Sequence, residues 1–193
     1  MLYQAKAFEQ ALNDKIALAC MDDRLKWWHG PYEELKVEID NTAWNRIQQV
    51  SVDSSNNICG YFNAHVHHPN YSIDSLSCIN FGSNKMLFAK DLISFLKCLV
   101  YTKKFRKISW RVTIGNPVEA HYDKLVKRLG GRIVGIERYD VFINREYYDS
   151  KLYEWVNDYY ECYNCGFRTK KEEEVMCWKC GLGEMLYHNP FKY

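Results

Sequence analysis

Apolar residues recur at three- and four-residue spacing in three stretches of the chain, the period of an α-helix with one buried face. These stretches cover residues 2–21, 86–100 and 117–129. Asn116 and Pro117 open the third stretch as a favourable N-cap and first-turn residue. Gly130 and Gly131 end it. The sequence therefore predicts three amphipathic helices.

Between these stretches apolar and polar residues alternate, as in strands with one buried face. Strands are predicted at residues 47–52, 58–67, 71–81, 108–114, 132–139 and 141–143. The turn residues 53–57 join the first two strands, and the first three form an antiparallel meander. Residues 149–160 are interpreted as an aromatic linker or a short helix. The order of elements predicts an α/β fold, a mixed sheet flanked by helices.

Composition and charge narrow the class of protein. The 193 residues are 47% apolar and 26% charged, which indicates one medium domain with a small appendage. A net charge of +2 gives no global field that would attract nucleic acid. We expect no membrane span and no signal peptide, since no long apolar run exists and Glu9 and Asp14 interrupt the N-terminal segment. Four of the eight cysteines are scattered singly, so we expect a reducing, cytoplasmic location.

Two Cys-x-x-Cys-Gly motifs near the C-terminus give the strongest chemical signal. Cys162 and Cys165 belong to the first, Cys177 and Cys180 to the second, and eleven residues separate Cys165 from Cys177. Two residues between thiolates let one turn present both sulfurs to a tetrahedral ion. Disulfides or a redox pair are the alternatives, and a reducing compartment favours zinc. Four thiolates close the coordination shell, so we expect a structural zinc ribbon within residues 154–193.

A second signal lies upstream, in residues 107–153. Its features are Ile114-Gly115-Asn116-Pro117 at a strand end, Ala120 and Tyr122 on the next helix, and Gly130-Gly131 after that helix. In order and pattern the chain resembles the GNAT superfamily of acyl-CoA-dependent N-acyltransferases. The resemblance implies an acyltransferase domain over residues 1–153, in which the fourth and fifth strands splay apart around acetyl-CoA.

The resemblance also implies where the cofactor binds. Backbone near the end of the fourth strand would hold the thioester carbonyl, and the N-terminus of the next helix would hold the pyrophosphate. The implied cofactor positions are Cys78, Ile79, Asn80, Gly82, Ser83, Asn84 and Lys85. This loop departs from the family pattern Arg/Gln-x-x-Gly-x-Gly/Ala, because only Gly82 remains of the glycines.

Catalytic roles follow from the same resemblance. Tyr122 is the implied general acid, Asn116 is the implied strand-end residue, and Asp74 on the fourth strand is a candidate base. A packed tyrosine and a helix N-cap explain Tyr122 and Asn116 equally well. The aromatic residues Trp27, Trp28 and Tyr32 fall in the region that shapes the acceptor site in the family.

Three functions stay open at this point. The leading hypothesis is an N-acetyltransferase that modifies an amine and uses the ribbon to recognise the acceptor or a partner. The second is an inactive GNAT-like protein, for example a phage or mobile-element modulator of host machinery, whose changed loop reflects loss of the cofactor. The third, not favoured, is a nucleic-acid-binding protein that uses residues 103–107, Lys124, Lys127, Arg128 and Arg132, provided that these share one face with Arg168 to Lys171.

Overall fold

The chain forms two compact units, Met1–Trp155 and Val156–Tyr193, in a computed structural model. The structure describes residues 1–20, 27, 37–40, 44–82, 84–157, 159–162, 164, 168–169, 180 and 185–188. In these ranges no helix combines the length and the apolar character needed to cross a membrane.

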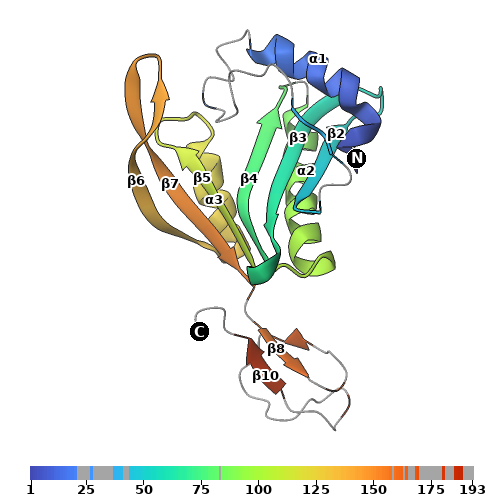
Figure 1. Cartoon of the computed structure of the whole chain (residues 1–193), viewed down its shortest axis with the longest axis vertical. Helices are drawn as coiled ribbons and strands as arrows, with labels where there is room; N and C mark the ends of the chain where they lie inside the picture. Colours follow the sequence, from blue (N-terminus) through green and yellow to red (C-terminus); the bar gives the residue numbers. More distant parts are fainter. Residues whose placement is uncertain are drawn as a thin grey trace. The chain divides into compact units, whose positions relative to one another are not determined.

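A seven-stranded sheet forms the centre of the first unit, in the order β1-β2-β3-β4-β5-β7-β6 (Figure 1). Its strands are β1 (Leu2–Gln4), β2 (Arg46–Val52), β3 (Ile58–His67), β4 (Ser72–Asn80), β5 (Lys107–Thr113), β6 (Arg132–Ile143) and β7 (Glu146–Val156). Strands β1 to β4 are antiparallel, β6 and β7 are antiparallel, and β4 and β5 are parallel. The mixed sheet and the meander of β2, β3 and β4 confirm the predicted α/β fold.

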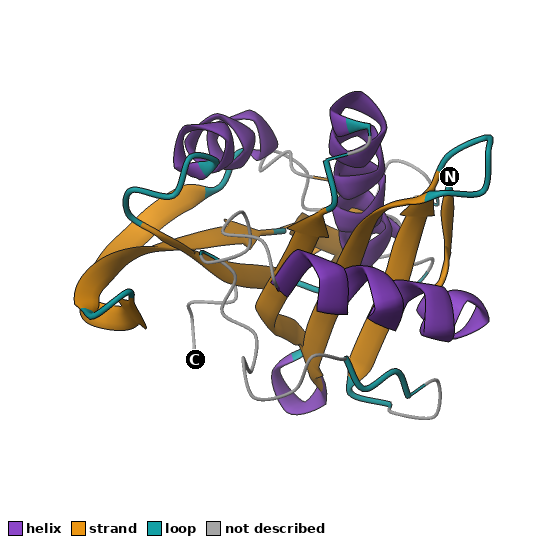
Figure 2. Ribbon diagram, turned by 90° about the horizontal axis from the view of Figure 1, so that it is seen from above, coloured by secondary structure: helices purple, strands orange, loops and turns teal. Residues whose placement is uncertain are grey.

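Helices cover both faces of this sheet (Figure 2). They are α1 (Glu9–Cys20), α2 (Lys85–Lys97) with its π-helical extension η4 (Cys98–Thr102), and α3 (Glu119–Leu129). Helix α1 packs on one face, and α2 and α3 share the other. Tyr61 and Phe62, neighbours on β3, are buried in the two opposite clusters because successive side chains of a strand point to opposite faces.

Strands β4 and β5 separate soon after they begin. Their parallel pairing consists of Ser72 with Lys107 and Ile73 with Ile108, although each strand continues for several more residues. Beyond Ile73 the pairing of β4 with β3 continues to the end of the strand. The other edge of β4 therefore faces the region between the two diverging strands (Figure 1). This splay agrees with what the family resemblance implies.

The N-terminal prediction is partly wrong. Residues 2–4 form the edge strand β1, which places Leu2 opposite Ser51 of β2, and a 3-10 turn, Ala5–Phe8, precedes α1. Ladder hydrogen bonds to β2 outweigh the helical period in this short stretch, because propensity alone is a weak local preference.

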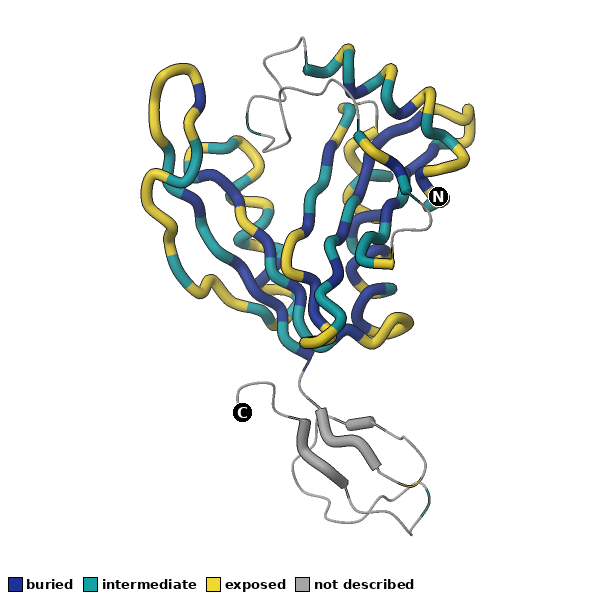
Figure 3. The backbone as a smooth tube through the Cα atoms, in the orientation of Figure 1, coloured by how far each residue is buried: buried dark blue, intermediate teal, exposed yellow. Residues whose placement is uncertain are grey.

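The last two strands also differ from the prediction. Residues 132–143 form one strand rather than two, with a register shift between Glu137 and Val141. Figure 3 shows β6 as largely exposed, and the adjacent Ile133 and Val134 are 45% and 47% exposed, so no clean alternation marks this edge strand. The predicted linker or helix at 149–160 is wrong, because β7 extends to Val156.

Candidate functional site

Tyr122 and Cys78 bring α3 and β4 into contact. Cys78 lies on β4, five residues beyond Ile73 and therefore past the pairing with β5. Both side chains are half-buried and pack against one core cluster. The Tyr122 hydroxyl and the Cys78 sulfur interact, and each shifts the pKa of the other. The structure thus joins the implied general acid to one of the implied cofactor positions.

This contact and its surroundings change the pKa of both groups. Burial raises the pKa of Cys78 to about 12, against the smaller lowering effect of the hydrogen bond from Tyr122. Burial first, and the Cys78 sulfur second, raise the pKa of Tyr122 well above its ordinary value. At neutral pH the Cys78 thiol is therefore a poor nucleophile, whereas Tyr122 keeps a proton that it can donate.

Asn116 lies in the turn between β5 and α3. Helix α3 begins at Glu119 with Val118 as its N-cap, so the prediction of Asn116 as N-cap is wrong by two positions. The Asn116 side-chain oxygen accepts from the backbone N–H of Val118 at 3.1 Å. Its amide therefore closes the turn that precedes the helix, a common role of asparagine.

Asp74 is not brought to the Tyr122 hydroxyl. A register shift between His65 and Val66 of β3 leaves Asp74 as the extra residue of a bulge in β4. Its side chain is exposed and accepts a hydrogen bond of 2.6 Å from the Ser72 hydroxyl. Asp74 lies four positions before Cys78, roughly 13 Å along a strand.

Two asparagine side chains shape the loop between β4 and α2. Asn80 accepts from the backbone N–H of Gly82 at 2.8 Å, and Gly82 adopts a φ of 81°. Asn84 caps α2 by accepting from the backbone N–H of Leu87 at 3.0 Å. The first N–H groups of an α-helix lack intrahelical partners, and with the helix dipole they favour an anion.

The other implied cofactor positions offer different groups. Ile79 is buried in the cluster beneath α1, so its side chain is directed away from the Tyr122 side of the sheet. Lys85 is the exposed first residue of α2. Ser83 lies outside the described residues.

A polar network fixes α3 on β7 and was not predicted from the sequence. The Tyr153 hydroxyl donates to Asp123 at 2.6 Å, and the Lys151 ammonium lies 3.0 Å from Asp123 and 2.5 Å from Glu119. The Gly115 N–H donates to Glu119 at 2.9 Å. Two features of the sequence could have indicated this network. Glu119 and Asp123 have i,i+4 spacing on the helix, and Lys151 and Tyr153 are two residues apart, as side chains on one face of a strand are.

The charges in this network stabilise one another. The hydrogen bonds from Tyr153 and then Lys151 lower the pKa of Asp123, and those from Lys151 and then Gly115 lower the pKa of Glu119. Hydrogen bonds to Glu119 and then Asp123 raise the pKa of Lys151. Both carboxylates are therefore ionised and engaged at neutral pH.

Trp27 lies close to the end of β5 and to the start of β7. Its ring packs edge-on against Tyr148, with centroids 5.3 Å apart and planes at 80°. A Cβ on Gly115, which follows β5, would lie 3.7 Å from the Trp27 ring. Trp28 and Tyr32 lie outside the described residues.

The second unit carries a three-stranded sheet in the order β10-β8-β9. Its strands are β8 (Tyr159–Cys162), β9 (Arg168–Thr169) and β10 (Met185–His188). Asn164, inside the first Cys-x-x-Cys motif, donates to the Cys180 sulfur of the second at 3.6 Å. This contact brings together one residue from each motif. Cys165 and Cys177 fall outside the described residues, and in the remainder no group of three or more metal-ligating side chains occurs.

Comparison with known proteins identifies the architecture. No family model and no curated protein matches the sequence. Among solved structures, spermidine N-acetyltransferase from Vibrio cholerae in complex with CoA and spermine has a TM-score of 0.64 and 18% identity, over 81% of this chain and 94% of that one. The chain has the GNAT fold. An N-acetyltransferase from Staphylococcus aureus Mu50 gives 0.61 and 18%, over 81% and 97%.

A third GNAT structure matches over a shorter length. Mutant forms of the spermidine/spermine N-acetyltransferase from Vibrio cholerae give a TM-score of 0.52 and 22% identity, over 60% of this chain. The present chain spans 66% of that one. All three matches concern N-acetyltransferases, so Tyr122, the free edge of β4 and the N-terminus of α2 are positioned by a GNAT scaffold.

Proposed function

We propose that the first unit is an N-acetyltransferase that transfers an acetyl group from acetyl-CoA to an amine. The observation that carries this proposal is that Tyr122 of α3 and Cys78 of β4 pack against the same core cluster and interact with each other. It places a protonated hydroxyl beside the part of β4 that β5 leaves uncovered, where a thioester would lie.

The shape of β4 supports binding of the pantetheine arm. Backbone N–H and C=O groups alternate between the two edges of a strand, so those on the edge away from β3 are available to the amides of the cofactor. The thioester would then lie near Cys78, Ile79 and Asn80. The pyrophosphate would lie over the region from Gly82 to Lys85, at the N-terminus of α2.

The chemistry balances with the residues at hand. The acceptor, after loss of a proton from its ammonium form, attacks the thioester carbonyl, so that a C–N bond forms and the C–S bond breaks. The attacking nitrogen releases its second proton to solvent as the amide forms. Tyr122 gives its proton to the leaving thiolate and regains one from solvent. We do not assign Asp74 as the base, because it lies too far along β4.

The acceptor is proposed to be an amine that is cationic in solution. Trp27 and Tyr148 place two aromatic rings at the ends of β5 and β7, and such rings attract alkylammonium groups. A structural neighbour was solved with spermine, which makes polyamines the first acceptors to test.

For the second unit we propose a structural zinc held by Cys162, Cys165, Cys177 and Cys180. The donation from the Asn164 amide to the Cys180 sulfur supports this, because zinc-bound thiolates accept such hydrogen bonds. A closed shell of four thiolates leaves no position for substrate, so the ribbon would serve recognition of the acceptor or of a protein partner.

The decisive experiment combines calorimetric titration of acetyl-CoA with a thiol-release assay on spermidine and spermine. We expect Tyr122→Phe to lower kcat by roughly 10²-fold or more, with the Kd for acetyl-CoA unchanged. Cys78→Ala is the matched control, because it removes the partner of Tyr122 but not the proton donor, and it should change kcat only a few-fold. Lys85→Ala should weaken cofactor binding.

Two results would count against the proposal. Absence of binding at millimolar acetyl-CoA would refute the cofactor site. Full kcat in Tyr122→Phe would remove Tyr122 as the general acid.

A further inference from the structure

Positive charge is concentrated in one segment of the first unit. Residues 85–129 contain eleven Lys and Arg but three Asp and Glu, a net charge of +8 in a chain whose total is +2. The rest of the chain is therefore acidic. The small total conceals this separation, which is why composition alone gives no sign of an anionic partner.

The three carboxylates of this segment do not neutralise its surface. Asp91 is buried and accepts from the Ser51 hydroxyl at 2.8 Å and from the amino group of Met1 at 3.0 Å. Glu119 and Asp123 are both engaged by Lys151 of β7. All three are thus occupied by groups from outside residues 85–129.

Seven cations of the segment are exposed and have no ion-pair partner in the part of the chain that the structure describes. We call them the basic face: Lys90, Lys97, Lys103, Lys104, Lys124, Lys127 and Arg128. They belong to α2, η4 with the turn after it, and α3, the helices that share one face of the sheet. Lys85 is left out, because it belongs to the proposed cofactor loop.

Helix dipoles do not account for the whole basic face. Cations in the last turn of a helix are favoured by its dipole, which suffices for Lys97, Lys127 and Arg128. It does not explain Lys90 and Lys124, which lie near the middle of their helices.

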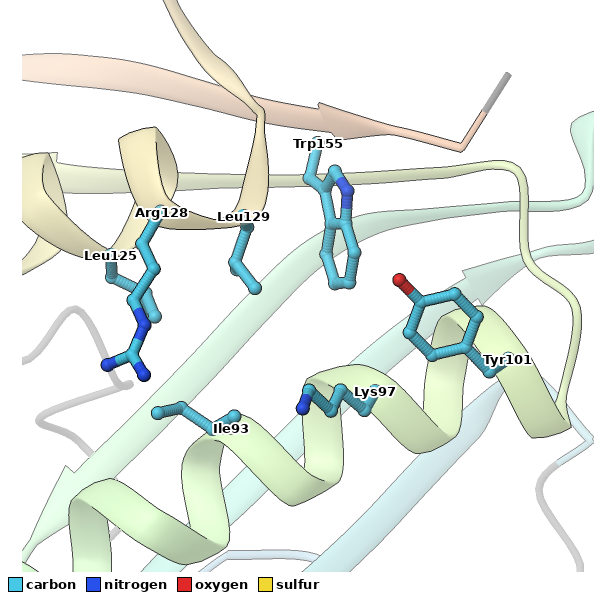
Figure 4. A pocket seen from close by; sticks show the side chains of 7 residues that line it. All are labelled: Ile93, Lys97, Tyr101, Leu125, Arg128, Leu129 and Trp155. Carbon is cyan, nitrogen blue, oxygen red and sulfur yellow. The ribbon is translucent and has the colours of Figure 1, made fainter. Parts of the chain in front are cut away.

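A pocket opens between α2 and α3 in the middle of these charges (Figure 4). Lys97 of α2 and Arg128 of α3 line it from its two sides, and its volume is about 210 Å³. The remaining lining is apolar or aromatic: Ile93, Leu125, Leu129, Tyr101 and Trp155. Lys97 lies twelve residues after Lys85, about 18 Å along α2, so this pocket is distinct from the proposed cofactor loop.

Aromatic rings form one end of the pocket. Tyr101 is 61% exposed and packs edge-on against the buried Trp155, with ring centroids 6.2 Å apart. An exposed ring that a second ring holds from the side is a suitable stacking surface for a planar group. The pocket thus offers an exposed ring at one end and two cations along its sides, Lys97 and Arg128, neither of which has an ion-pair partner among the described residues.

We infer that the basic face binds single-stranded nucleic acid, with one base in the pocket against Tyr101 and backbone phosphates on the surrounding cations. Stacking surfaces within a cationic track are how proteins hold single strands without reading their sequence. An acidic protein segment would pair with the cations, but it would not explain the aromatic pocket. This inference does not depend on the acetyltransferase activity.

The test is fluorescence anisotropy of the full chain with labelled 20-nucleotide RNA and DNA single strands of one mixed sequence. A duplex of that sequence and poly-glutamate serve as comparison ligands. We expect either single strand to bind, with a salt dependence of log K against log [salt] of roughly −3 to −5, as expected when most of seven cations contact phosphate.

Variants separate charge from stacking. Lys97→Glu combined with Arg128→Glu should weaken binding at least tenfold and flatten the salt dependence. Tyr101→Ala should weaken it about fivefold or more while the salt dependence stays unchanged. Arg145→Glu, a charge reversal in the exposed β6–β7 turn, is the matched control and should change the Kd less than twofold.

Four results would overturn the inference: no binding of either single strand at 50 mM salt, wild-type affinity in both variants, duplex binding as tight as single-strand binding, or poly-glutamate binding as tight as nucleic acid. The last would instead indicate an acidic protein partner. All the substituted positions are exposed, and thermal melting of each variant should match the wild type, so loss of binding would not reflect unfolding.

Discussion

The hydroxyl of Tyr122 illustrates how one residue changes meaning with its surroundings. In the sequence it is one of fifteen tyrosines, and nothing separates it from a packed side chain. In the fold it interacts with Cys78 of β4, and it keeps its proton at neutral pH because burial and the Cys78 sulfur raise its pKa. The residue type was predictable from the family resemblance, but its hydrogen-bond partner depends on tertiary packing.

Asp123 leads to a prediction about pH. Its pKa is below the ordinary value of 3.8 because Tyr153 and Lys151 donate to the carboxylate, so the unfolded chain binds the proton more readily than the folded one. The network stabilises the fold above about pH 4, and this contribution is lost as the pH falls through the folded pKa. The stability difference between wild type and Asp123→Asn should therefore be constant from about pH 7 to pH 5 and shrink below pH 4.

Urea midpoints at pH 7, 5, 4 and 3 measure this difference. Asp14→Asn provides the control, since Asp14 is a carboxylate on α1 that accepts from the neutral Gln10 at 2.8 Å. Its effect should stay within about 0.5 kcal/mol throughout. A stability difference for Asp123→Asn that grew toward low pH would contradict a lowered pKa of Asp123 in the folded chain.

Among the elements, the junction of α3 with β6 shows a difference between two adjacent glycines. Gly130 ends α3 with a φ of 75°, and a Cβ there would meet nothing within 4 Å. A Cβ on Gly131 would clash with the backbone oxygen of Glu154 in β7. Gly130 is thus required for its backbone conformation, and Gly131 for the close approach of two chain segments.

Alanine substitutions should separate the two requirements. Gly130→Ala should cost about 1–2 kcal/mol, the penalty of a left-handed conformation. Gly131→Ala should cost more, about 3 kcal/mol, because backbone rather than a side chain must move. Urea unfolding of the two variants measures this, and equal losses would show that β7 shifts without strain.

How far the elements could be predicted depended on whether their buried face is apolar. The alternation in residues 58–67 marked β3 correctly, and Gly130-Gly131 marked the end of α3. Strand β7 was missed because Lys151, on the side that faces α3, is polar and paired with acidic residues of that helix. The sequence of such a strand shows no alternation of apolar and polar residues, because polar side chains on its inward side pair with residues of another element.

The candidate site could also be predicted only in part. The family pattern singled out Cys78 and Tyr122, and the structure brings these two side chains to the same core cluster. Asp74 was assigned by its place on the strand, but a bulge there moves it out of the alternation. The basic face was visible as separate charges in the sequence, and only the packing of α2 beside α3 shows that Lys97 and Arg128 line one pocket.

For the whole molecule, the division into two units gives a prediction about metal. Freshly purified reduced protein should contain about one zinc per chain, and Cys177→Ser should lose it, because three thiolates hold zinc much more weakly than four. Elemental analysis measures the content, with Cys98→Ser as the control for loss of an unrelated cysteine.

Removal of the zinc should leave the first unit intact. Since Met1–Trp155 has its own core, the heat of acetyl-CoA binding should survive treatment with a chelator, while the ribbon loses its structure. Reduced protein without metal, or zinc retained in Cys177→Ser, would rule out the proposed set of four thiolates.

The early separation of β4 from β5 has a consequence for how such a chain can diverge. An uncovered strand edge presents the same main-chain groups whatever residues compose the strand, so a ligand held there imposes little selection on side-chain identity. Mutations can then accumulate as long as the two strands still part at the same point. This accounts for a scaffold that aligns over 81% of the chain with an acetyltransferase at 18% identity, while no family model detects it from sequence.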